Sequence, residues 1–370
     1  MARPLRVACI AGARPNFMKI APVMRALEAS SSLEGLIVHT GQHYDRNMSE
    51  VFFQELGIPA PAINLEVGSS TQGIQTGRIM AAFDEVFERV APELVLVVGD
   101  VNSTLACALV ARHRQVPVAH VEAGLRSFDE TMPEEINRIL TDRISDLLFT
   151  TESSAAENLE REGIPSSRVH FTGNTMIDTL AFMLPRIESS GTLETLGASP
   201  PYGLVTFHRP GNVDRADLLR RLTFLLVDQS RHIPLVFPVH PRTRKRLVQL
   251  GLWDSLEAEP GIMLLQPLPY TQFMALVRKS AFVLTDSGGI QEETTWLGVP
   301  CLTQRTSTER PITVDEGTNT LLGDDLEATE RAIGRILNGD YQPGNRPHLW
   351  DGHAAERIVS VLESWLRERQ

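Results

Sequence analysis

The sequence predicts an α/β protein built from two doubly wound parallel sheets. Short apolar runs alternate with longer helical segments along most of the 370 residues, which is the pattern of repeated βαβ units. The alternation stops over residues 186–202, which are rich in Ser, Gly, Thr and Pro, and then starts again. A chain of this length favours two domains. We therefore expect one domain over residues 1–185, a second over 203–353, and a C-terminal helix over 354–370 that packs back on the first.

Apolar runs predict the strands of both halves, and segments compatible with helices lie between them. The expected strands are Leu5–Ala11, Gly35–His39, Leu94–Gly99, Val116–Val121, Leu147–Thr150, Val169–Thr172, Gly203–Thr206, Leu235–Pro238, Ile262–Leu265, Phe282–Thr285 and Val299–Leu302. The expected helices are Phe17–Ala29, Thr71–Arg89, Ser103–Arg112, Pro133–Ile144, Ser153–Glu162, Ala216–Arg231, Tyr270–Lys279, Ile290–Leu297 and Ala354–Arg369. Ligands of such sheets bind at the carboxyl ends of the strands, so a site is expected in the cleft between the two domains.

Composition excludes several classes of function. The net charge of −11 argues against general affinity for nucleic acid or for an anionic membrane. The chain enters a strand without a signal peptide, and no apolar run approaches the length of a membrane span. Its three cysteines are far apart in sequence, which favours a reduced cytosolic protein without a disulfide or zinc site. The sequence has no Walker loop for a nucleoside triphosphate and no GxGxxG fingerprint for a nicotinamide or flavin cofactor. It also lacks the GxSxG elbow of serine hydrolases.

The run from Leu284 to Glu293, L-T-D-S-G-G-I-Q-E-E, is the most informative stretch. It predicts a buried strand, a tight glycine turn and a helix N-terminus, whose free N–H groups and dipole favour an anion. Gly288 and Gly289 allow the backbone to approach a phosphate closely. Glu293, one turn into the helix, could hold ribose hydroxyls. The run alone indicates either a nucleotide diphosphate site or an ordinary strand–turn–helix whose glycines serve the turn.

Charged residues also follow the early strands of the first half. Arg14 and Lys19 flank a helix start after the first strand, where they could bind an anion or simply lie on the surface. Asp100 ends a buried strand, where it could cap the next helix or act as an acid or base.

Two further acidic positions differ in how strongly they suggest a function. Glu122 follows a Val-rich strand and precedes a glycine turn, so it needs either a partner, such as Arg126, or a functional role. Glu134 and Glu135 open a predicted helix, where its dipole stabilises acidic residues even without a function.

Cations and histidines end strands of the second half. His208 and Arg209 follow the first strand there, and a histidine at such a position can assist a leaving group or hold a phosphate oxygen. His240 ends another strand and carries less weight. Arg310 follows the last expected strand, where it could complete a phosphate clamp or lie on the surface.

Taken together, eight motifs resemble the family of non-hydrolysing UDP-N-acetylglucosamine 2-epimerases. They occur in order between Gly12 and Arg310, over most of the chain, which makes the resemblance highly specific. The motifs are GARPNFMK (12–19), GDVNS (99–103), HVEAGLR (120–126), PEEINR (133–138), TGNT (172–175), HR (208–209), TDSGGIQEE (285–293) and TERP (308–311).

The resemblance implies two Rossmann-like domains in the GT-B architecture, with UDP held by the second. It implies that Ser287, Gly288 and Gly289 hold the diphosphate, Glu293 the ribose, and His208 and Arg310 further phosphate oxygens. Gln266 and Phe273 would bracket uracil, and Arg14 and Lys19 would face the same ligand from the first domain.

The implied reaction inverts carbon 2 of the sugar, with elimination of UDP to a 2-acetamidoglucal and its re-addition. Asp100, Glu122 and Glu134 are the matching carboxylates, assisted by His208. The resemblance implies no cofactor and no metal ion, and a cytoplasmic homodimer whose product serves cell-envelope polysaccharide synthesis.

Some residues of this chain depart from the family pattern. Asn16 stands where many members have Glu, and Pro210-Gly211 follows His-Arg where many have other residues. Gln42 and His43 fit the region of an effector site in the family, but residues 68–78 match the family pattern poorly there. Activation by substrate is therefore doubtful for this chain.

Alternatives to the epimerase are a 2-epimerase of a modified UDP-sugar such as a diacetamido uronic acid, a non-catalytic nucleotide-sugar sensor, and a GT-B glycosyltransferase. The three carboxylates argue against the last two.

Overall fold

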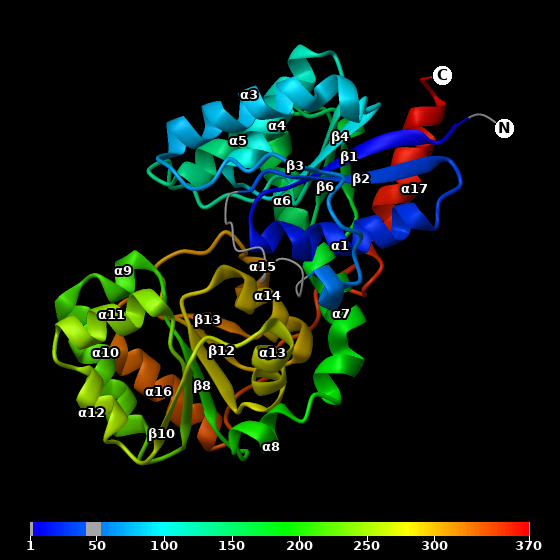
Figure 1. Cartoon of the computed structure of the whole chain (residues 1–370). Coiled ribbons are helices and arrows are strands. Elements are labelled where there is room, and N and C mark those ends of the chain that lie inside the picture. The colour runs from blue at the N-terminus through cyan, green and yellow to red at the C-terminus, as the bar shows by residue number, and fades with distance from the viewer. Residues whose placement is uncertain (1–2, 42–52, 370) are drawn as a thin grey trace. The chain divides into compact units, whose positions relative to one another are not determined.

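The computed structural model describes residues 3–41 and 53–369 of the chain. It divides into two compact units (Figure 1). Unit 1 comprises Met1–Phe182 with His348–Gln370, and unit 2 comprises Met183–Pro347. No helix among the described residues is long and apolar enough to cross a membrane.

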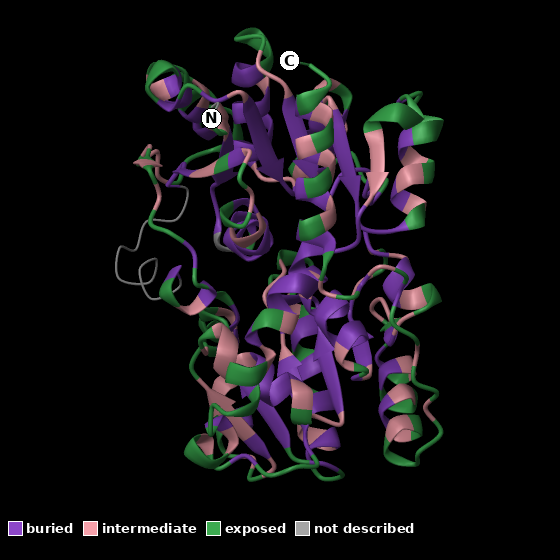
Figure 2. Cartoon of the chain, turned by 90° about the vertical axis from the view of Figure 1, so that its right-hand side faces the viewer, coloured by how far each residue is buried: buried purple, intermediate pink, exposed green. Residues whose placement is uncertain are grey.

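Unit 1 is built on a parallel sheet with the strand order β3-β2-β1-β4-β5-β6-β7. Its described strands are β1 (Leu5–Ala11), β2 (Leu33–His39), β3 (Ile63–Asn64), β4 (Leu94–Val98), β5 (Val118–Val121), β6 (Leu147–Thr150) and β7 (Val169–Phe171). All residues of β4 and β5 are buried, as expected for central strands covered on both faces. Figure 2 shows most of the strand residues buried, while the outer sides of many helices are exposed.

Helices flank this sheet in two groups. The first group packs α3, α4 and α5 side by side, and α17 lies beside α1 in the second (Figure 1). Phe83 and Phe87 of α3 pack with Val95 and Val97 of β4 in the core. The helices of unit 1 whose two ends both lie in the described ranges are α1 (Arg14–Glu28), α3 (Gln72–Val90), α4 (Asn102–His113), α5 (Pro133–Ile144), α6 (Ser153–Arg161), η1 (Ser166–Arg168), α7 (Thr175–Glu188, which continues into unit 2) and α17 (Ala354–Arg367).

Unit 2 repeats the same plan around a second parallel sheet. The strand order is β10-β9-β8-β11-β12-β13. Its described strands are β8 (Gly203–Thr206), β9 (Leu235–Pro238), β10 (Ile262–Leu265), β11 (Phe282–Thr285), β12 (Cys301–Thr303) and β13 (Asn319–Leu321). Its helices are α8 (Thr192–Leu196), α9 (Pro210–Val213), α10 (Ala216–Gln229), α11 (Pro241–Gln249), α12 (Trp253–Glu257), α13 (Tyr270–Lys279), α14 (Gly288–Leu297), α15 (Ile312–Asp315) and α16 (Leu326–Leu337). The predicted fold class, two doubly wound parallel sheets, is confirmed.

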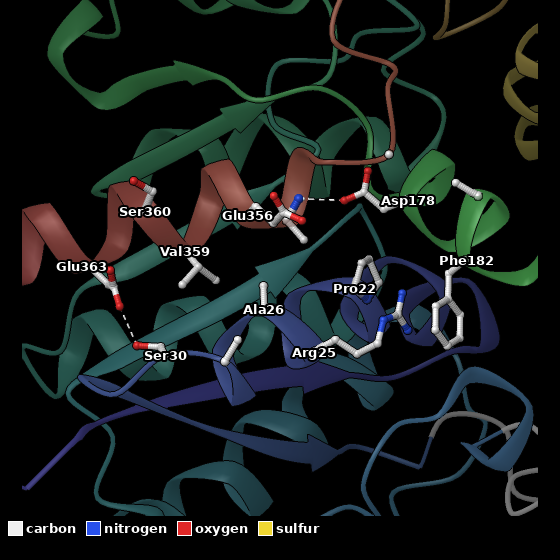
Figure 3. A pocket seen from close by; sticks show the side chains of 14 residues that line it. Pro22, Arg25, Ala26, Ser30, Asp178, Phe182, Glu356, Val359, Ser360 and Glu363 are labelled. Carbon is white, nitrogen blue, oxygen red and sulfur yellow. Dashed lines mark hydrogen bonds between the residues drawn. The ribbon is translucent and has the colours of Figure 1, made fainter.

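Helix α17 is fastened to unit 1 by polar contacts at both ends. The Asp178 carboxylate accepts the backbone N–H groups of Ala354 at 3.1 Å and Ala355 at 2.7 Å, which caps the start of the helix. Near its other end, Glu363 accepts a hydrogen bond from the Ser30 hydroxyl at 2.6 Å. A cavity of about 550 Å³ lies between α1, α7 and α17, with these contacts at its margins (Figure 3). None of the expected site residues lines this cavity.

Candidate active site

Both sheets bring several of the expected site residues to the point where the strand order reverses, or to the neighbouring strand end. Chain order runs outward from β1 in unit 1 and from β8 in unit 2, so the reversal lies between β1 and β4 and between β8 and β11. Ligands of doubly wound sheets bind at such switch points. In the ladder, Val98 lies opposite Val121, and Thr206 lies opposite Thr285. The turn carrying Asp100 is therefore beside Glu122, and the turn carrying His208 is beside Asp286.

Glu122 forms a buried ion pair with Lys19 of α1. The two side chains are 5% and 8% exposed, respectively. Glu122 has a φ of +70°, a left-handed conformation that costs about 1–2 kcal/mol for a residue with a Cβ. Such strain is kept where the surroundings fix the backbone, and it is common at active sites.

The expectation that Arg126 would partner Glu122 is wrong. Arg126 lies beyond the turn at Gly124, where φ is +80°, and it pairs instead with Asp142 at 2.8 Å and with Glu162 at 2.7 Å. The partner of Glu122 comes from α1, about a hundred positions away in the sequence, so local sequence could not identify it.

Gly99 makes room for the Lys19 ammonium group. Its φ is +65°, and a Cβ at this position would lie 2.9 Å from Lys19 Nζ. A side chain here would have to displace the ammonium group that pairs with Glu122. The turn after β4 thus shapes the surroundings of both Asp100 and Glu122.

Asp100 and Glu134 line one cavity of about 240 Å³ in unit 1. Arg138 of α5 lies 3.0 Å from Asp100 Oδ2, and the Asp100 side chain remains 25% exposed. Asn137 donates to the Asp100 carbonyl at 2.9 Å, so α5 holds both the backbone and the side chain of this residue. The remaining lining residues are mostly polar: Ser69, Ser70, Gln72, Gln75, Val101, Asn102, Pro133 and Asn137.

The neighbouring residues Glu134 and Glu135 occupy different environments. Glu135 is buried and accepts hydrogen bonds from the backbone N–H groups of Ser127 and Phe128 and from the Ser127 hydroxyl. It also pairs with Arg138. Glu135 therefore holds a loop, whereas the half-buried Glu134 faces the cavity that contains Asp100.

In unit 2, Asp286 orders the turn that carries His208. Its carboxylate lies 3.0 Å from His208 Nδ1 and accepts the N–H groups of His208 at 3.1 Å and Arg209 at 2.9 Å. Asn212 donates to it at 3.1 Å. Burial alone would raise the pKa of Asp286, but these donors hold the pKa below its usual range. Asp286 is thus an ionised anchor, and the His208 side chain stays 39% exposed.

Three arginines gather around Glu309 beside the start of α14. Arg305 and Arg310 form ion pairs with Glu309, and Arg209 lies 3.9 Å from it. Burial lowers the pKa of Arg209 and the charge of Arg305 lowers it further, while Glu309 and Asp286 oppose the shift. Arg310 also lies 3.0 Å from Glu292, so carboxylates offset part of the positive charge of this group, which can still bind an anion through its guanidinium donors.

The backbone at the start of α14 also favours binding of an anion. Ser287 is the N-cap residue and makes no side-chain cap hydrogen bond. A Cβ on Gly288 would lie 2.8 Å from Arg310 NH1, so this glycine allows the arginine to reach the helix N-terminus. Cations and a helix N-terminus together form an anion-binding arrangement.

Glu293 lies one turn further along α14, in a fully buried setting. Burial and the nearby charge of Glu292 raise the pKa of Glu293 to about 8, against an opposing hydrogen bond from Tyr270. The Tyr270 hydroxyl donates to Glu293 Oε1 at 2.9 Å. A buried carboxyl group with one neutral donor can accept further hydroxyl donors from a ligand.

The sequence pattern described as UDP-N-acetylglucosamine 2-epimerase matches residues 25–363, which is most of the chain. The chain belongs to the UDP-N-acetylglucosamine 2-epimerase family. The members of this family are isomerases. A UDP-N-acetylglucosamine 2-epimerase from Methanocaldococcus jannaschii is 41% identical over 97% of this chain and 99% of its own length.

A solved structure of this relative and one further relative extend the comparison. A crystal structure of the M. jannaschii epimerase in complex with UDP-GlcNAc and UDP is 40% identical, has a TM-score of 0.88, and aligns over 97% of this chain and 100% of its own. This agrees with the expected pair of Rossmann-like domains of the GT-B type. A UDP-2,3-diacetamido-2,3-dideoxy-D-glucuronate 2-epimerase from Pseudomonas aeruginosa is 40% identical over 97% of this chain and 99% of its own.

The other residues expected for this epimerase family are placed in part. Gln266 is exposed just after β10, and Phe273 is half-buried in the first turn of α13, so both follow the same strand end. Arg14 begins α1, but its side chain is outside the part of the chain that the structure describes. Gln42 and His43 also lie outside the described residues.

Sequence reasoning missed Asp286 and Tyr270 as parts of the site. Asp286 had a signal, since it directly follows a buried strand and lies within the TDSGG motif. Tyr270 had no such sequence signal, because its hydrogen bond to Glu293 joins two helices with a strand between them in the sequence.

Proposed function

We propose that this chain interconverts UDP-N-acetylglucosamine and UDP-N-acetylmannosamine. The observation that carries the proposal is the placing of Asp100 and Glu134 on one cavity, with Glu122 at the adjoining strand end. The M. jannaschii relative, whose structure was solved with UDP-GlcNAc and UDP, supports the choice of nucleotide sugar.

In this proposal unit 2 holds UDP. The diphosphate lies at the N-terminus of α14, against Ser287, Gly288 and Gly289, with His208 and Arg310 on its oxygens. Glu293 accepts the ribose hydroxyls, and Gln266 and Phe273 bracket the uracil. Arg14 and Lys19 belong to unit 1 and contribute positive charge toward the same ligand.

The reaction starts by breaking two bonds. The C2–H bond breaks, its proton passes to a carboxylate, and its electron pair forms the C1–C2 double bond. The C1–O bond breaks with its electron pair leaving on UDP, which gives 2-acetamidoglucal. The proton on C2 is not next to a carbonyl and is not acidic, so departure of UDP has to develop positive charge at C1 to assist its loss. The cations around the diphosphate stabilise the negative charge that collects on UDP.

The return steps invert the sugar. A phosphate oxygen of UDP attacks C1, and a second carboxyl group delivers a proton to the opposite face of C2. The two carboxyl groups then regain their starting protonation states by exchange with water, and nothing is oxidised or reduced overall. Asp100, Glu122 and Glu134 supply the groups on which this division of labour rests.

A second candidate function is the epimerisation of a UDP-linked diacetamido uronic acid. It is favoured by the P. aeruginosa relative, which matches this chain at nearly the same identity as the M. jannaschii enzyme. The same bonds break and form in both reactions, so the two candidates differ only in the substituents at carbons 3 and 5.

We extend the proposal to the cellular setting. The enzyme acts as a cytoplasmic homodimer, and a glycosyltransferase consumes its product for cell-envelope polysaccharide. Light scattering of the purified protein tests the dimer, and a mass equal to one chain would contradict it.

Incubation of the full chain with each UDP-sugar in turn tests the function. We expect UDP-GlcNAc to reach a stable mixture with UDP-ManNAc, resolved by the anomeric proton signals. The matched variant Glu122→Gln should react at least about 10²-fold more slowly. Turnover of the uronic acid alone would favour the second candidate, and binding without turnover of either sugar would favour the sensor.

A further inference from the structure

His120, a buried residue of β5, bridges two turns of the candidate active site. Its Nε2 atom lies 2.8 Å from the carbonyl oxygen of Gly99, the residue before Asp100. Its Nδ1 atom lies 2.7 Å from Asp142 Oδ1 on α5. The His120 and Asp142 side chains are both fully buried, so these bonds are shielded from water.

Each ring nitrogen of His120 faces a different hydrogen-bond partner. A carbonyl oxygen can only accept, so Nε2 carries a proton. Asp142 accepts the Gly124 N–H at 3.1 Å and pairs with Arg126 at 2.8 Å. Burial opposes its ionisation, but His120 and Arg126 hold the pKa of Asp142 below its usual range. The Asp142 carboxylate is therefore the hydrogen-bond partner of His120 Nδ1, at 2.7 Å.

These bonds join the backbone that carries Asp100 to the backbone that carries Glu122. Gly99 donates its N–H to the Val121 carbonyl at 3.0 Å and receives the His120 Nε2–H on its own carbonyl. On the other side of Glu122, Asp142 holds the Gly124 N–H. Asp142 is also part of α5, the helix that carries Glu134 in its first turn and binds Asp100 through Arg138.

We infer that His120 is a positioning residue that fixes the spacing between Asp100 and Glu122. The inference rests on the proposed function, in which carboxyl groups act on opposite faces of carbon 2. The rate of proton transfer falls steeply when a reacting group is displaced, and a displacement of about 1 Å can lower the rate about 10²-fold. A buried bridge between the two turns prevents such a displacement.

Two variants separate the two hydrogen bonds. In His120→Gln the amide nitrogen can take the place of Nε2 and reach the Gly99 carbonyl, but Asp142 loses its contact with the ring. In His120→Asn the amide can reach Asp142, but the Gly99 carbonyl loses its donor. We expect each variant to lower kcat about 10- to 100-fold, with KM within about threefold of wild type.

A kinetic isotope effect separates positioning from simple loss of folded protein. With substrate deuterated at carbon 2, the isotope effect on kcat should rise in both variants, because proton removal becomes slower relative to other steps. Partial unfolding removes active sites and leaves the isotope effect unchanged. The control is His170→Gln, a half-buried histidine of β7 whose ring contacts Phe149, and it should keep wild-type kinetics.

The outcomes are distinguishable. Wild-type protein that exchanges no hydrogen at carbon 2 would overturn the proposed function and the inference with it. An active wild type whose His120 variants keep its kcat, or lose kcat with an unchanged isotope effect, would overturn the inference alone. If both variants fail to fold, nitrogen NMR of wild-type protein with labelled histidine decides. We expect a proton on His120 Nε2 that exchanges slowly with water, as its bond to the Gly99 carbonyl requires, and an Nε2 atom without a proton would overturn the inference.

Discussion

His208 and Asp286 are joined by two hydrogen bonds across the neighbouring ends of β8 and β11. The Nδ1 atom of His208 lies 3.0 Å from Asp286 Oδ1, and the backbone N–H of His208 donates to the same carboxylate at 3.1 Å. One buried carboxylate thus fixes both the ring and the backbone of the histidine that we propose to contact the diphosphate.

Replacing Asp286 by Asn should therefore impair the reaction. The amide group places donors opposite the N–H groups of His208 and Arg209, which leaves buried groups unpaired and costs about 1–3 kcal/mol. We expect kcat to fall about 10- to 100-fold as His208 loses its orientation. Steady-state kinetics check this, with Asp228→Asn on α10, whose side chain is 49% exposed, as the control. Wild-type kcat in Asp286→Asn would show that the anchor is dispensable.

Gly99→Ala should affect activity more than its effect on stability explains. The φ of +65° costs about 1–2 kcal/mol for alanine, and the new Cβ would lie 2.9 Å from Lys19 Nζ. The matched control is Gly163→Ala, at a φ of +74° with no atom within 4 Å of the added Cβ. Urea unfolding should give similar losses of stability for both variants, while only Gly99→Ala loses epimerase activity. Equal activities would mean that the Lys19 position is not critical.

Glu293 should make the stability of the protein depend on pH. Burial raises its pKa to about 8 from the ordinary 4.5, so between these values the folded state holds a proton that the unfolded chain releases. The stabilisation of the folded state by this proton is therefore complete below pH 4.5 and is lost as the pH rises through 8. The free energy of unfolding should fall by up to about 1.4 kcal/mol per pH unit in this window. Denaturant unfolding of wild type and Glu293→Gln checks this, and parallel pH profiles would contradict it.

Asp178→Ala should loosen the C-terminal helix from unit 1. Its carboxylate caps α17 through two backbone N–H groups, at 3.1 and 2.7 Å. Loss of such a cap costs about 0.5–2 kcal/mol. We expect faster hydrogen exchange at the first turn of α17, measured by mass spectrometry, while exchange in α16 of unit 2 serves as the internal control. Unchanged exchange in α17 would contradict the capping role.

Sequence predicted most of the sheet framework. The bounds of β1, β6 and β8–β11 match the apolar runs residue for residue, because buried parallel strands need continuous apolar sequence. The edge strands β3 and β13 were missed, since they are two and three residues long and carry no clear run. Helix α7 was missed as well, and with α8 it supplies helical turns in the stretch expected to be a linker.

The candidate site was predictable by position but not by contact. Asp100, Glu122, His208 and the glycine turn at 288 stand at strand ends, and strand ends can be recognised in the sequence. Their partners come from distant segments, as the pair of Lys19 with Glu122 shows. Arg126 was the expected partner of Glu122 because it lies close to it in the sequence. That prediction failed because the chain turns at Gly124, between the two residues.

Proton NMR of the full chain with UDP-N-acetylglucosamine in heavy water is the most direct test of the proposed reaction. We predict a second anomeric signal from UDP-N-acetylmannosamine, with deuterium in place of hydrogen at carbon 2 of the product, because the returning proton comes from a carboxyl group that exchanges with solvent. Protein that binds UDP but leaves the UDP-N-acetylglucosamine signal and its carbon 2 hydrogen unchanged would contradict the assignment of Asp100, Glu122 and Glu134 to this reaction.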